Sequence, residues 1–440
     1  MRKATLIALI GYLLLRSILA VLPGYDWDTT LFKQWALFAA RDGVEEIYVQ
    51  AEEMDYPPLI AYILYPLGKI YLATDPEAAD DLALEAIPES SALTALVKLP
   101  AIVFDLVIAG LLALWVRRLP AGLVHDDRWT RFLPWLYLLN PAVLFNGAYW
   151  GQVDAIHSAF VLAAFLWLCW GRSAWPAWVL LTLAVLMKPL AAPFFPLFAA
   201  ASLVRYGLRS SVTGGLAAIG TGLLVFSPYL ATGRIVPTIE RVVGDLGAMA
   251  YMSTNGHNLW WALGGGWQDS EVPWLGPFTA TQVAVVLFGL FYLAVFIVGQ
   301  RLRARDSTPI LGLAFVVAFG FFMLATHMHE NHVFVAIPLL LPLTVLRGPR
   351  LAWTRRILAA LSVGLLLNMA LHDERVLKLT YLAAGPASGV MNEHVERPFF
   401  LAELWAIRVS LWWNLVLFTV VVAESFRKGG WLERLPRASR

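Results

Sequence analysis

The chain has 440 residues and a formal net charge of +2, and it combines 59% hydrophobic with only 15% charged residues, which gives a mean hydropathy of +0.66. A soluble domain of this length needs less apolar material to fill its core, so the composition indicates a polytopic membrane protein. The single cysteine, Cys169, excludes an intrachain disulfide and a cysteine-based metal site.

Unbroken apolar runs, rather than alternating strands, occupy most of the chain. Because lipid offers the backbone no hydrogen-bond partner, such runs predict helices. We predict an all-α, polytopic transmembrane helical bundle of about 12 spans, which forms a single domain over residues 1–440. Prolines in or beside several runs predict broken or half-length helices. In chain order, the predicted spans are 4–22, 94–116, 132–148, 153–170, 174–187, 190–204, 213–230, 280–299, 309–326, 333–346, 357–371 and 401–423.

The basic residues predict the orientation of the bundle. With the N-terminus inside, most of the 33 lysines and arginines fall on cytoplasmic segments, as the positive-inside rule requires. Three long segments then lie outside the membrane: 23–93, 231–279 and 372–400.

The run 57–73, PPLIAYILYPLGKIYLA, is not counted as a span. If it crossed, the acidic stretch 74–93 would become cytoplasmic and every later loop would invert its charge bias. Proline in its first turn, and Pro66 with Lys69 inside it, instead predict a helix that lies at, or dips into, the outer interface. Residues 23–93 therefore form one large outer loop that carries interfacial helices.

The segment EEMDYPPLIAY, residues 52–62, places an acid before two prolines on this loop. A residue before proline is held extended and two prolines stiffen the backbone, so the carboxylate of Asp55 is held at a defined place. That geometry suits a general base, although a solvated acid before a proline-capped helix fits as well. Asp26 and Asp28 form an Asp-x-Asp pair, which is either a divalent-metal ligand pair or an acidic outer end of the first span.

Further polar residues lie at predicted outer turns. Gln152 and Asp154, with Asn140 and Trp150, flank a half-length pair of spans, where an unwound turn would expose backbone groups to an outer cavity. Lys188 precedes a proline at another outer turn, where it either binds an anion or snorkels to the interface.

Two more outer segments carry aromatic and histidine residues. Asn258 and Trp260 belong to STNGHNLWW, which forms either a sugar-stacking patch or part of an interfacial aromatic belt. The three histidines of THMHENH, residues 326–332, cannot all point one way at a helix end, so their spacing argues against zinc. His329 is instead placed to donate hydrogen bonds to a phosphate.

Two ionisable residues fall within predicted spans. Asp105 and Arg408 are functional candidates because charge inside a membrane is costly, but they fit a buried structural pair equally well.

Taken in order, these motifs resemble the GT-C superfamily of integral membrane glycosyltransferases. The stretches that carry the resemblance are GYDWD, DYPPLIAY, NPAVLFNGAYWGQVDAIHSAF, LAVLMKPLAAPFFPL, NGHNLWW and MHENH. Asp-Tyr-Pro-Pro-Leu followed by Trp-Gly-Gln-x-Asp is fairly specific, and the likeness runs through most of the chain. Within the superfamily, the chain looks most like the dolichyl-phosphate-glucose-dependent glucosyltransferases that extend lipid-linked oligosaccharides, and their prokaryotic relatives.

The resemblance implies roles for particular residues. Asp55 corresponds to the aspartate that is implicated as catalytic base in that family, and Asp28 to an earlier recurring acid. His329 and Glu330 correspond to a His-Glu pair thought to lie near the donor phosphate. The chain departs from the family pattern at Asn331, where relatives usually carry Lys or Arg.

A positive contact to phosphate is therefore absent from its usual place, which leaves His329, Lys188 or Arg375 to supply it. The full set of residues expected to bind the substrates or the donor phosphate is His329, Glu330, Lys188, Asp26, Gln152, Asp154, Asn258 and Trp260. No metal ligand is assigned and no cofactor is required, although the Asp-x-Asp pair allows a divalent metal.

The implied activity is that of an inverting hexosyltransferase. A sugar would pass from a polyprenyl-phosphate or dolichyl-phosphate donor to a lipid-linked glycan or glycolipid acceptor on the outer face of the membrane. The expected partners are these two substrates and membrane lipids, with no nucleic acid. The expected location is the plasma membrane of a prokaryote or the endoplasmic reticulum of a eukaryote, with the active site on the extracytoplasmic face.

Three other classes of protein remain open: a transporter or flippase, an oligosaccharide ligase or polymerase, and a non-catalytic subunit, for which the sequence holds no distinguishing feature. A transporter or flippase of lipid-linked glycans would place ionisable residues near the bilayer midplane, often in two repeated halves, whereas this chain has no internal repeat and its acids crowd the outer segments. An oligosaccharide ligase would be expected to have its large outer loop late in the chain, whereas here it comes first.

Overall fold

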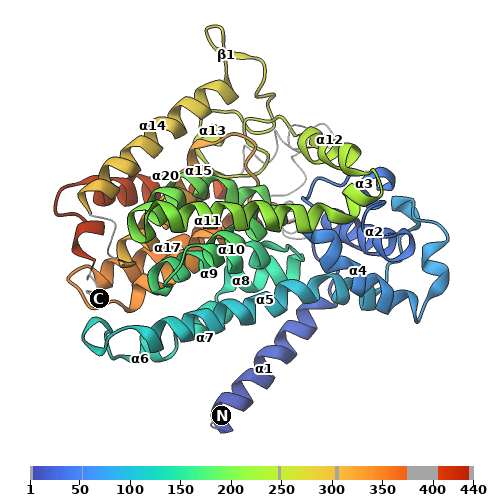
Figure 1. Ribbon diagram of the computed structural model, residues 1–440, viewed down its shortest axis with the longest axis horizontal. Coiled ribbons are helices and arrows are strands. Elements are labelled where there is room, and N and C mark those ends of the chain that lie inside the picture. The colour runs from blue at the N-terminus through green and yellow to red at the C-terminus, as the bar shows by residue number, and fades with distance from the viewer. Residues whose placement is uncertain (1–2, 52, 246–248, 303–306, 374–404, 436–440) are drawn as a thin grey trace. The chain divides into compact units, whose positions relative to one another are not determined.

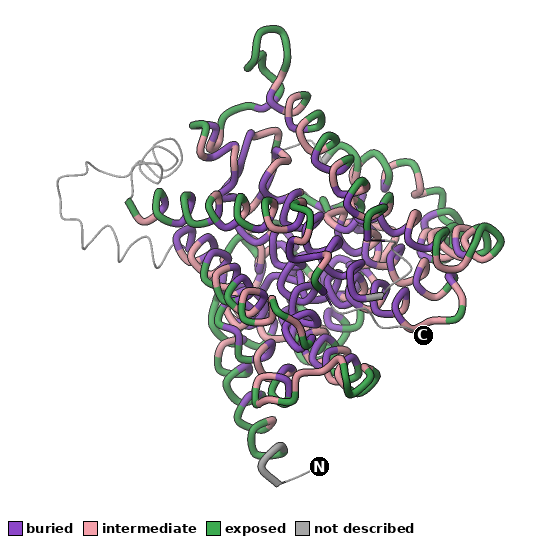
Figure 2. The backbone as a smooth tube through the Cα atoms, turned by 90° about the vertical axis from the view of Figure 1, so that its left-hand side faces the viewer, coloured by how far each residue is buried: buried purple, intermediate pink, exposed green. Residues whose placement is uncertain are grey.

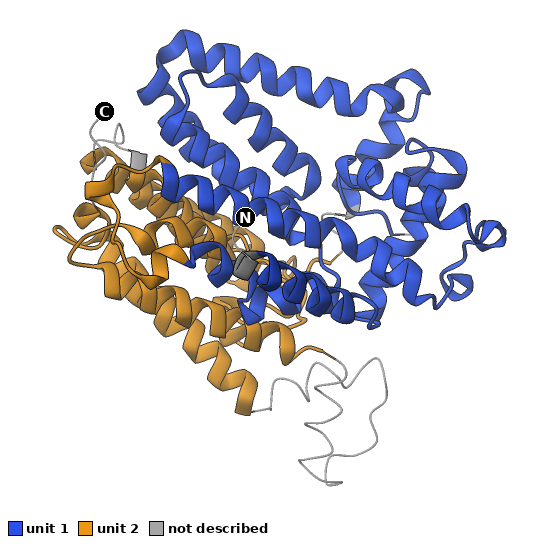
Figure 3. Cartoon of the chain, turned by 90° about the horizontal axis from the view of Figure 1, so that it is seen from below, with its two compact units in different colours: residues 1–117, 132–248 blue, residues 118–131, 249–440 orange. Residues whose placement is uncertain are grey.

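The computed structural model describes residues 3–51, 53–245, 249–302, 307–373 and 405–435 (Figure 1). Helix accounts for 74% of the structure, about twice the share in an average globular domain, so the all-α prediction is confirmed. The chain divides into two compact units, which Figure 3 distinguishes by colour. The first comprises Met1–Arg117 and Phe132–Ala248, and the second comprises Arg118–Arg131 and Met249–Arg440.

The helices of the first unit follow the predicted spans closely. They are α1 (Lys3–Ala20), α2 (Asp26–Asp42), α3 (Ile47–Gln50), α4 (Leu59–Leu72), η1 (Pro76–Ala79), η2 (Leu84–Ala86), α5 (Ser91–Arg118), α7 (Leu133–Leu138), α8 (Pro141–Val143), η4 (Leu144–Trp150), α9 (Asp154–Trp170), α10 (Trp175–Met187), η5 (Pro189–Phe194), α11 (Phe195–Ala231) and α12 (Ile235–Asp245). The predicted span 132–148 is broken into α7, α8 and the π-helical turn η4, as its prolines led us to expect.

The predicted spans 190–204 and 213–230 are two arms of α11. Gly207 interrupts the helix with φ 79° and ψ 173°, a conformation that suits glycine. The hydroxyls of Ser202 and Ser211 lie 3.1 Å apart, whereas nine residues of straight helix would separate them by about 13 Å. The chain therefore folds back on itself at Gly207.

The second unit contains a smaller set of helices and one short hairpin. Its elements are η3 (Ala121–Leu123), α6 (Arg128–Arg131), α13 (Leu259–Ala262), α14 (Ala280–Arg301), α15 (Ser307–Leu324), α16 (Ala336–Leu340), η6 (Leu341–Val345), α17 (Leu351–Ala370), α20 (Trp405–Phe426) and η7 (Leu432–Arg434), with strands β1 (Pro273–Leu275) and β2 (Phe278–Thr279) pairing antiparallel. Most of the predicted outer loop 372–400 lies outside the described residues.

Five helical segments within the described residues are long and apolar enough to cross a membrane: Ser91–Arg118, Pro189–Ala231, Ala280–Arg301, Leu351–Ala370 and Trp405–Phe426. Other apolar helices are shorter than 18 residues, among them α9 and α10. The exposed residues of α1 are also largely apolar, including Ile7 at 69% and Leu14 at 59% exposure (Figure 2). These features indicate a membrane protein, while the count of about 12 spans stays a prediction.

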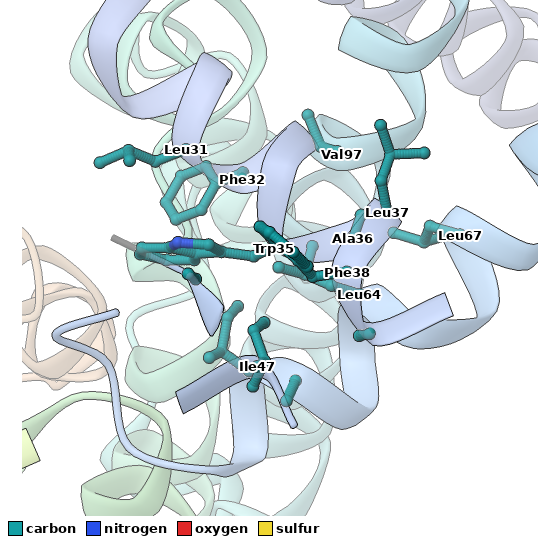
Figure 4. Close-up of a cluster of buried hydrophobic side chains, with 14 of the residues drawn as sticks. Leu31, Phe32, Trp35, Ala36, Leu37, Phe38, Ile47, Leu64, Leu67 and Val97 are labelled. Atoms are coloured by element: carbon teal, nitrogen blue, oxygen red, sulfur yellow. The ribbon is translucent and has the colours of Figure 1, made fainter. Parts of the chain in front are cut away.

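The large first loop is mostly helical and has a core of its own. Helices α2 and α4 pack together, with Phe32 and Trp35 of α2 against Leu64 of α4 (Figure 4). Trp35 is 1% exposed and Leu64 is 0% exposed. The predicted helix in the run 57–73 is therefore present as α4, but its buried face covers α2, and its expected place at the membrane interface stays a prediction.

The crossing of α2 and α4 is close because Gly68 has no side chain. A Cβ atom at Gly68 would lie 2.0 Å from the carbonyl oxygen of Ala36 and 2.7 Å from the Cβ of Ala40. The two helices must therefore separate to accept any larger residue at this position.

We predict that Gly68→Ala lowers the stability of the protein by about 1–3 kcal/mol, because the added methyl group overpacks this crossing. The matched control is Gly110→Ala in α5, where a Cβ would meet no atom within 4 Å. Thermal unfolding in detergent should show a lower Tm for the first variant and an unchanged or slightly higher Tm for the second. Equal shifts would contradict the close crossing.

Candidate functional site

The acidic motif lies on a loop whose backbone is fixed. Asp55 is exposed, whereas its neighbours Met54, Pro57 and Pro58 are buried. The hydroxyl of Tyr48 donates to the carbonyl oxygen of Tyr56 at 2.7 Å, and the guanidinium of Arg241 donates to that of Ala51 at 2.7 Å. The carboxylate of Asp55 is thus presented to solvent from an anchored segment, which is the geometry expected of a general base.

The Trp-Gly-Gln-x-Asp motif begins where the π-helical turn η4 ends. Gly151 has φ 95°, and the backbone N–H groups of Gly151 and Gln152 both donate to the carbonyl oxygen of Asn146, at 3.1 and 3.0 Å. The turn directs the side chain of Gln152 toward α2, where its amide donates to the carboxylate of Asp28. Two motifs that are 124 positions apart in the sequence are therefore in direct contact.

Asp154 is the first residue of α9 and is 0% exposed. One carboxylate oxygen accepts a hydrogen bond from the ammonium of Lys188 at 2.7 Å, and the other accepts one from the amide of Asn146 at 3.0 Å. The imidazole Nδ1 of His157 lies 3.8 Å from the same carboxylate. A buried ion pair is tolerated only when such additional contacts satisfy its remaining polar atoms.

Lys188 joins this pair to the acidic motif. Its ammonium lies 5.5 Å from the centre of the Tyr56 ring and hydrogen-bonds to the Tyr56 side chain. Burial alone would lower the pKa of Lys188, but the carboxylate of Asp154 and the phenol of Tyr56 outweigh burial and raise it. Lys188 is therefore a charged, paired residue that is 6% exposed, and it does not snorkel.

Tyr56 interacts electrostatically with the charged residues of the site. Burial raises the pKa of its phenol, and the Lys188 ammonium opposes that rise. Three carboxylates add to the rise: Asp55, Asp154 and Asp28. These acids come from three separate segments of the chain, so one unit brings together Asp28, Asp55, Gln152, Asp154 and Lys188.

Asp26 lies in the first turn of α2 and is exposed. Within the described ranges, no three or more His, Cys, Asp or Glu side chains are arranged to hold a metal ion. Acids in a first helical turn also interact favourably with the helix dipole, which gives Asp26 and Asp28 a structural role at this position.

The other predicted binding residues belong to the second unit. Asn258 caps α13, where its side-chain oxygen accepts from the N–H groups of Trp260 and Trp261 at 3.0 and 3.1 Å. Trp260 is 0% exposed and donates its indole N–H to the carbonyl oxygen of Leu324 at 2.8 Å. Both residues thus have capping and packing contacts inside this unit.

The histidine motif spreads its side chains as its spacing predicts. His327 contacts Ser270 at 2.7 Å between Nε2 and Oγ, whereas the rings of His329 and His332 lie together with centres 5.0 Å apart. His329 is half-buried and Glu330 is buried. The roles predicted for His329 and Glu330 at a donor phosphate stay predictions.

A buried polar cluster fixes the segment that precedes α13. The imidazole of His257 contacts Ser410 at 2.7 Å through Nδ1 and His372 at 3.0 Å through Nε2. The backbone N–H of His257 donates to Asn368 at 2.8 Å, and Asn414 donates to its carbonyl oxygen at 3.1 Å. This cluster was not predicted, because each partner of His257 is more than 100 positions away from it in the sequence.

The suggested pairing of Asp105 with Arg408 is wrong. Asp105 forms an ion pair with Arg16 at 2.7 Å and accepts a hydrogen bond from Tyr137 at 2.6 Å, and Asp105 and Arg16 are each at most 1% exposed. Arg408 is an exposed residue of α20. The cost of burying Asp105 is met by a partner in α1, which sequence spacing could not identify.

Four residues at the first unit's site were also missed: Tyr56, Lys98, Asn146 and His157. Tyr56, Asn146 and His157 stand inside the motifs that carry the family resemblance, and Lys98 lies in the predicted span 94–116, but each looked like part of an apolar helix or its edge. A polar residue in an apolar run was the available signal.

No family model matches the chain, and no curated protein matches it either.

We predict that Lys188→Met and Asp154→Asn each destabilise the protein by about 3–5 kcal/mol, because each leaves one buried polar partner uncompensated. The double variant should lose less than the sum of the two single losses, since it leaves no unpaired charge. Thermal unfolding of the four proteins in detergent measures this coupling. Additive losses would show that the ion pair contributes nothing as a pair.

The cluster at His257 predicts a loss of stability in acid. Burial lowers the pKa of His257 to about 3 in the folded protein, from the usual 6.5. Between these values the unfolded chain binds a proton that the folded chain does not, so stability is full above 6.5 and falls as the pH is lowered toward 3.

The measurement is Tm against pH for wild type and His257→Gln. The wild-type stability should fall more steeply below pH 6.5, by up to about 1.4 kcal/mol per pH unit. Parallel curves for the two proteins would rule out His257 as the titrating group.

Proposed function

We propose that this chain is an inverting glycosyltransferase that moves a sugar from a polyprenyl-phosphate donor to a lipid-linked glycan or glycolipid acceptor. The observation that carries the proposal is the convergence of Asp28, Asp55, Asp154 and Lys188 on Tyr56, with Asp55 exposed on an anchored loop. The apolar helices support it further, because a lipid-linked donor keeps its tail in a bilayer.

The reaction requires one proton acceptor. The acceptor hydroxyl oxygen attacks the anomeric carbon and forms the new glycosidic bond, while the bond from that carbon to the phosphate oxygen breaks. The hydroxyl proton passes to Asp55, and the electron pair of the broken bond leaves with the phosphate. A single displacement inverts the configuration at the anomeric carbon.

The neighbours of Asp55 favour this chemistry over a purely structural role. The Lys188 ammonium is paired with Asp154 at 2.7 Å and lies 5.5 Å from the centre of the Tyr56 ring, so the residue that follows Asp55 is held by a buried ion pair. Gln152 holds Asp28 in place by a hydrogen bond, so a second carboxylate is positioned in the same unit. Asp28 then serves to orient the acceptor or to replace Asp55 as base.

A transporter or flippase of lipid-linked glycans is the alternative function. The fully buried Arg16–Asp105 pair lies within predicted spans, which is where such proteins carry ionisable residues. The two charges of that pair compensate each other at 2.7 Å, and the exposed carboxylate of Asp55 has no evident use in transport.

We predict that Asp55→Asn loses at least about 100-fold of the sugar-transfer rate, because it removes the proton acceptor. The assay offers a panel of polyprenyl-phosphate hexoses and pentoses to the protein in lipid nanodiscs with EDTA, using a glycolipid extract as acceptor. The matched control is Glu53→Gln, which neutralises an exposed acid two positions away and should transfer at the wild-type rate. Thermal melting checks that each variant is folded.

Transfer that survives in Asp55→Asn would move the base to Asp28 or Asp26. The absence of transfer from every donor by the wild-type protein would count against the transferase, and a scramblase assay with the same donors would then test the transporter.

A further inference from the structure

Lys98 is a buried lysine inside an apolar helix. It lies in α5 (Ser91–Arg118), one of the segments that can cross a membrane, and it is 0% exposed. Lysine is almost never fully buried unless its ammonium is paired, because removing the charge from water is costly. The hydrogen-bond partners of the Lys98 ammonium should therefore explain why a lysine stands at this position.

The ammonium of Lys98 donates to backbone carbonyl groups in two separate segments. It donates to Leu22 at 2.7 Å and to Tyr149 at 2.6 Å. The first carbonyl lies four residues before Asp26, and the second lies three residues before Gln152. Hydrogen bonds from a charged donor are stronger than neutral ones, so Lys98 links the two segments firmly.

The two segments also touch each other directly at this point. The N–H of Tyr25 donates to the carbonyl oxygen of Trp150 at 3.1 Å. The hydroxyl of Thr29 donates within its own segment, with Tyr25 as one acceptor at 3.0 Å. Lys98 therefore lies at a compact junction between residues 22–29 and 149–152.

Glycines make the close approach possible. Gly24 has φ 81°, and a Cβ there would lie 2.6 Å from the Tyr149 carbonyl oxygen and 2.8 Å from the Lys98 ammonium. Gly151 has φ 95°, and a Cβ there would lie 2.8 Å from the Thr29 methyl group. Each segment thus has a glycine where it meets the other, because no side chain fits.

We infer that Lys98 is a positioning residue that holds the segment of Asp28 against the segment of Gln152. The hydrogen bond between those two side chains joins the same two segments that Lys98 links through their carbonyl groups. Lys98 does not touch substrate, since it is fully buried. Its effect on catalysis rests on the function proposed above, but its effect on the junction does not.

Amide hydrogen exchange in nanodiscs tests the junction without any activity. Lys98→Met should speed exchange at least about tenfold at residues 24–29 and 149–154, because both segments lose their common anchor. The matched control is Lys33→Met, a second buried lysine of the same unit, whose ammonium lies 3.5 Å from the carbonyl oxygen of Pro88. It should leave exchange at 149–154 unchanged. Unchanged exchange in a folded Lys98→Met would overturn the proposal.

Gly24→Ala provides a second route if Lys98→Met does not fold. The added methyl group crowds the Tyr149 carbonyl oxygen and the Lys98 ammonium and forces the two segments apart, although the lysine is retained, and it should raise exchange at 149–154 as well as at 24–29. If exchange rises only at 24–29, the segments are not coupled and the proposal fails.

Steady-state kinetics then separates positioning from general stability. Lys98→Met should lower kcat at least about tenfold with little change in the donor KM, because a misplaced acid slows the reaction without removing donor contacts. A normal kcat in a variant with loosened segments would contradict positioning. If the wild-type protein transfers no sugar, the proposed function fails while the exchange result still decides the role of Lys98.

Discussion

The buried ion pair between Asp154 and Lys188 is the constraint on which the rest of the site depends. A carboxylate with no exposure to water is stable only if its charge is compensated, and Lys188 at 2.7 Å and Asn146 at 3.0 Å do so. Both contacts fix the chain locally, since Asn146 starts the turn that leads into Gln152. Lys188 in turn contacts Tyr56, the residue that follows the exposed Asp55.

The pair therefore positions two separate segments of the chain, one through each of its members. Through Asn146 and the turn at Gly151 it sets the direction of Gln152, which reaches Asp28. Through Tyr56 it anchors the acidic motif from inside, while Tyr48 anchors the same loop from its other side. The result is an exposed acid on a rigid support, which is the arrangement that proton transfer in a displacement reaction requires.

Much of the helical framework could be predicted from the sequence, because apolar runs in a chain of this hydropathy have few other ways to satisfy their backbone. The separation of the two arms of α11 was predicted as the spans 190–204 and 213–230, and the broken segment before Gln152 was predicted from its prolines, whereas the turn at Gly207 itself was not. The partners of the buried charges could not be predicted from the sequence. Asp105 pairs with Arg16 and Lys98 with two carbonyl groups, and such contacts are set by packing between distant segments. The cover that α4 provides over α2 has the same origin.

We propose that the anchored carboxylate of Asp55 serves a single displacement at an anomeric carbon. The most direct test is the anomeric configuration of the product, determined by NMR after transfer from a polyprenyl-phosphate sugar of known configuration. A single displacement gives the product the configuration opposite to that of the donor. A retained configuration would rule out a single displacement from the face opposite the phosphate and would contradict Asp55 as the base of such a step.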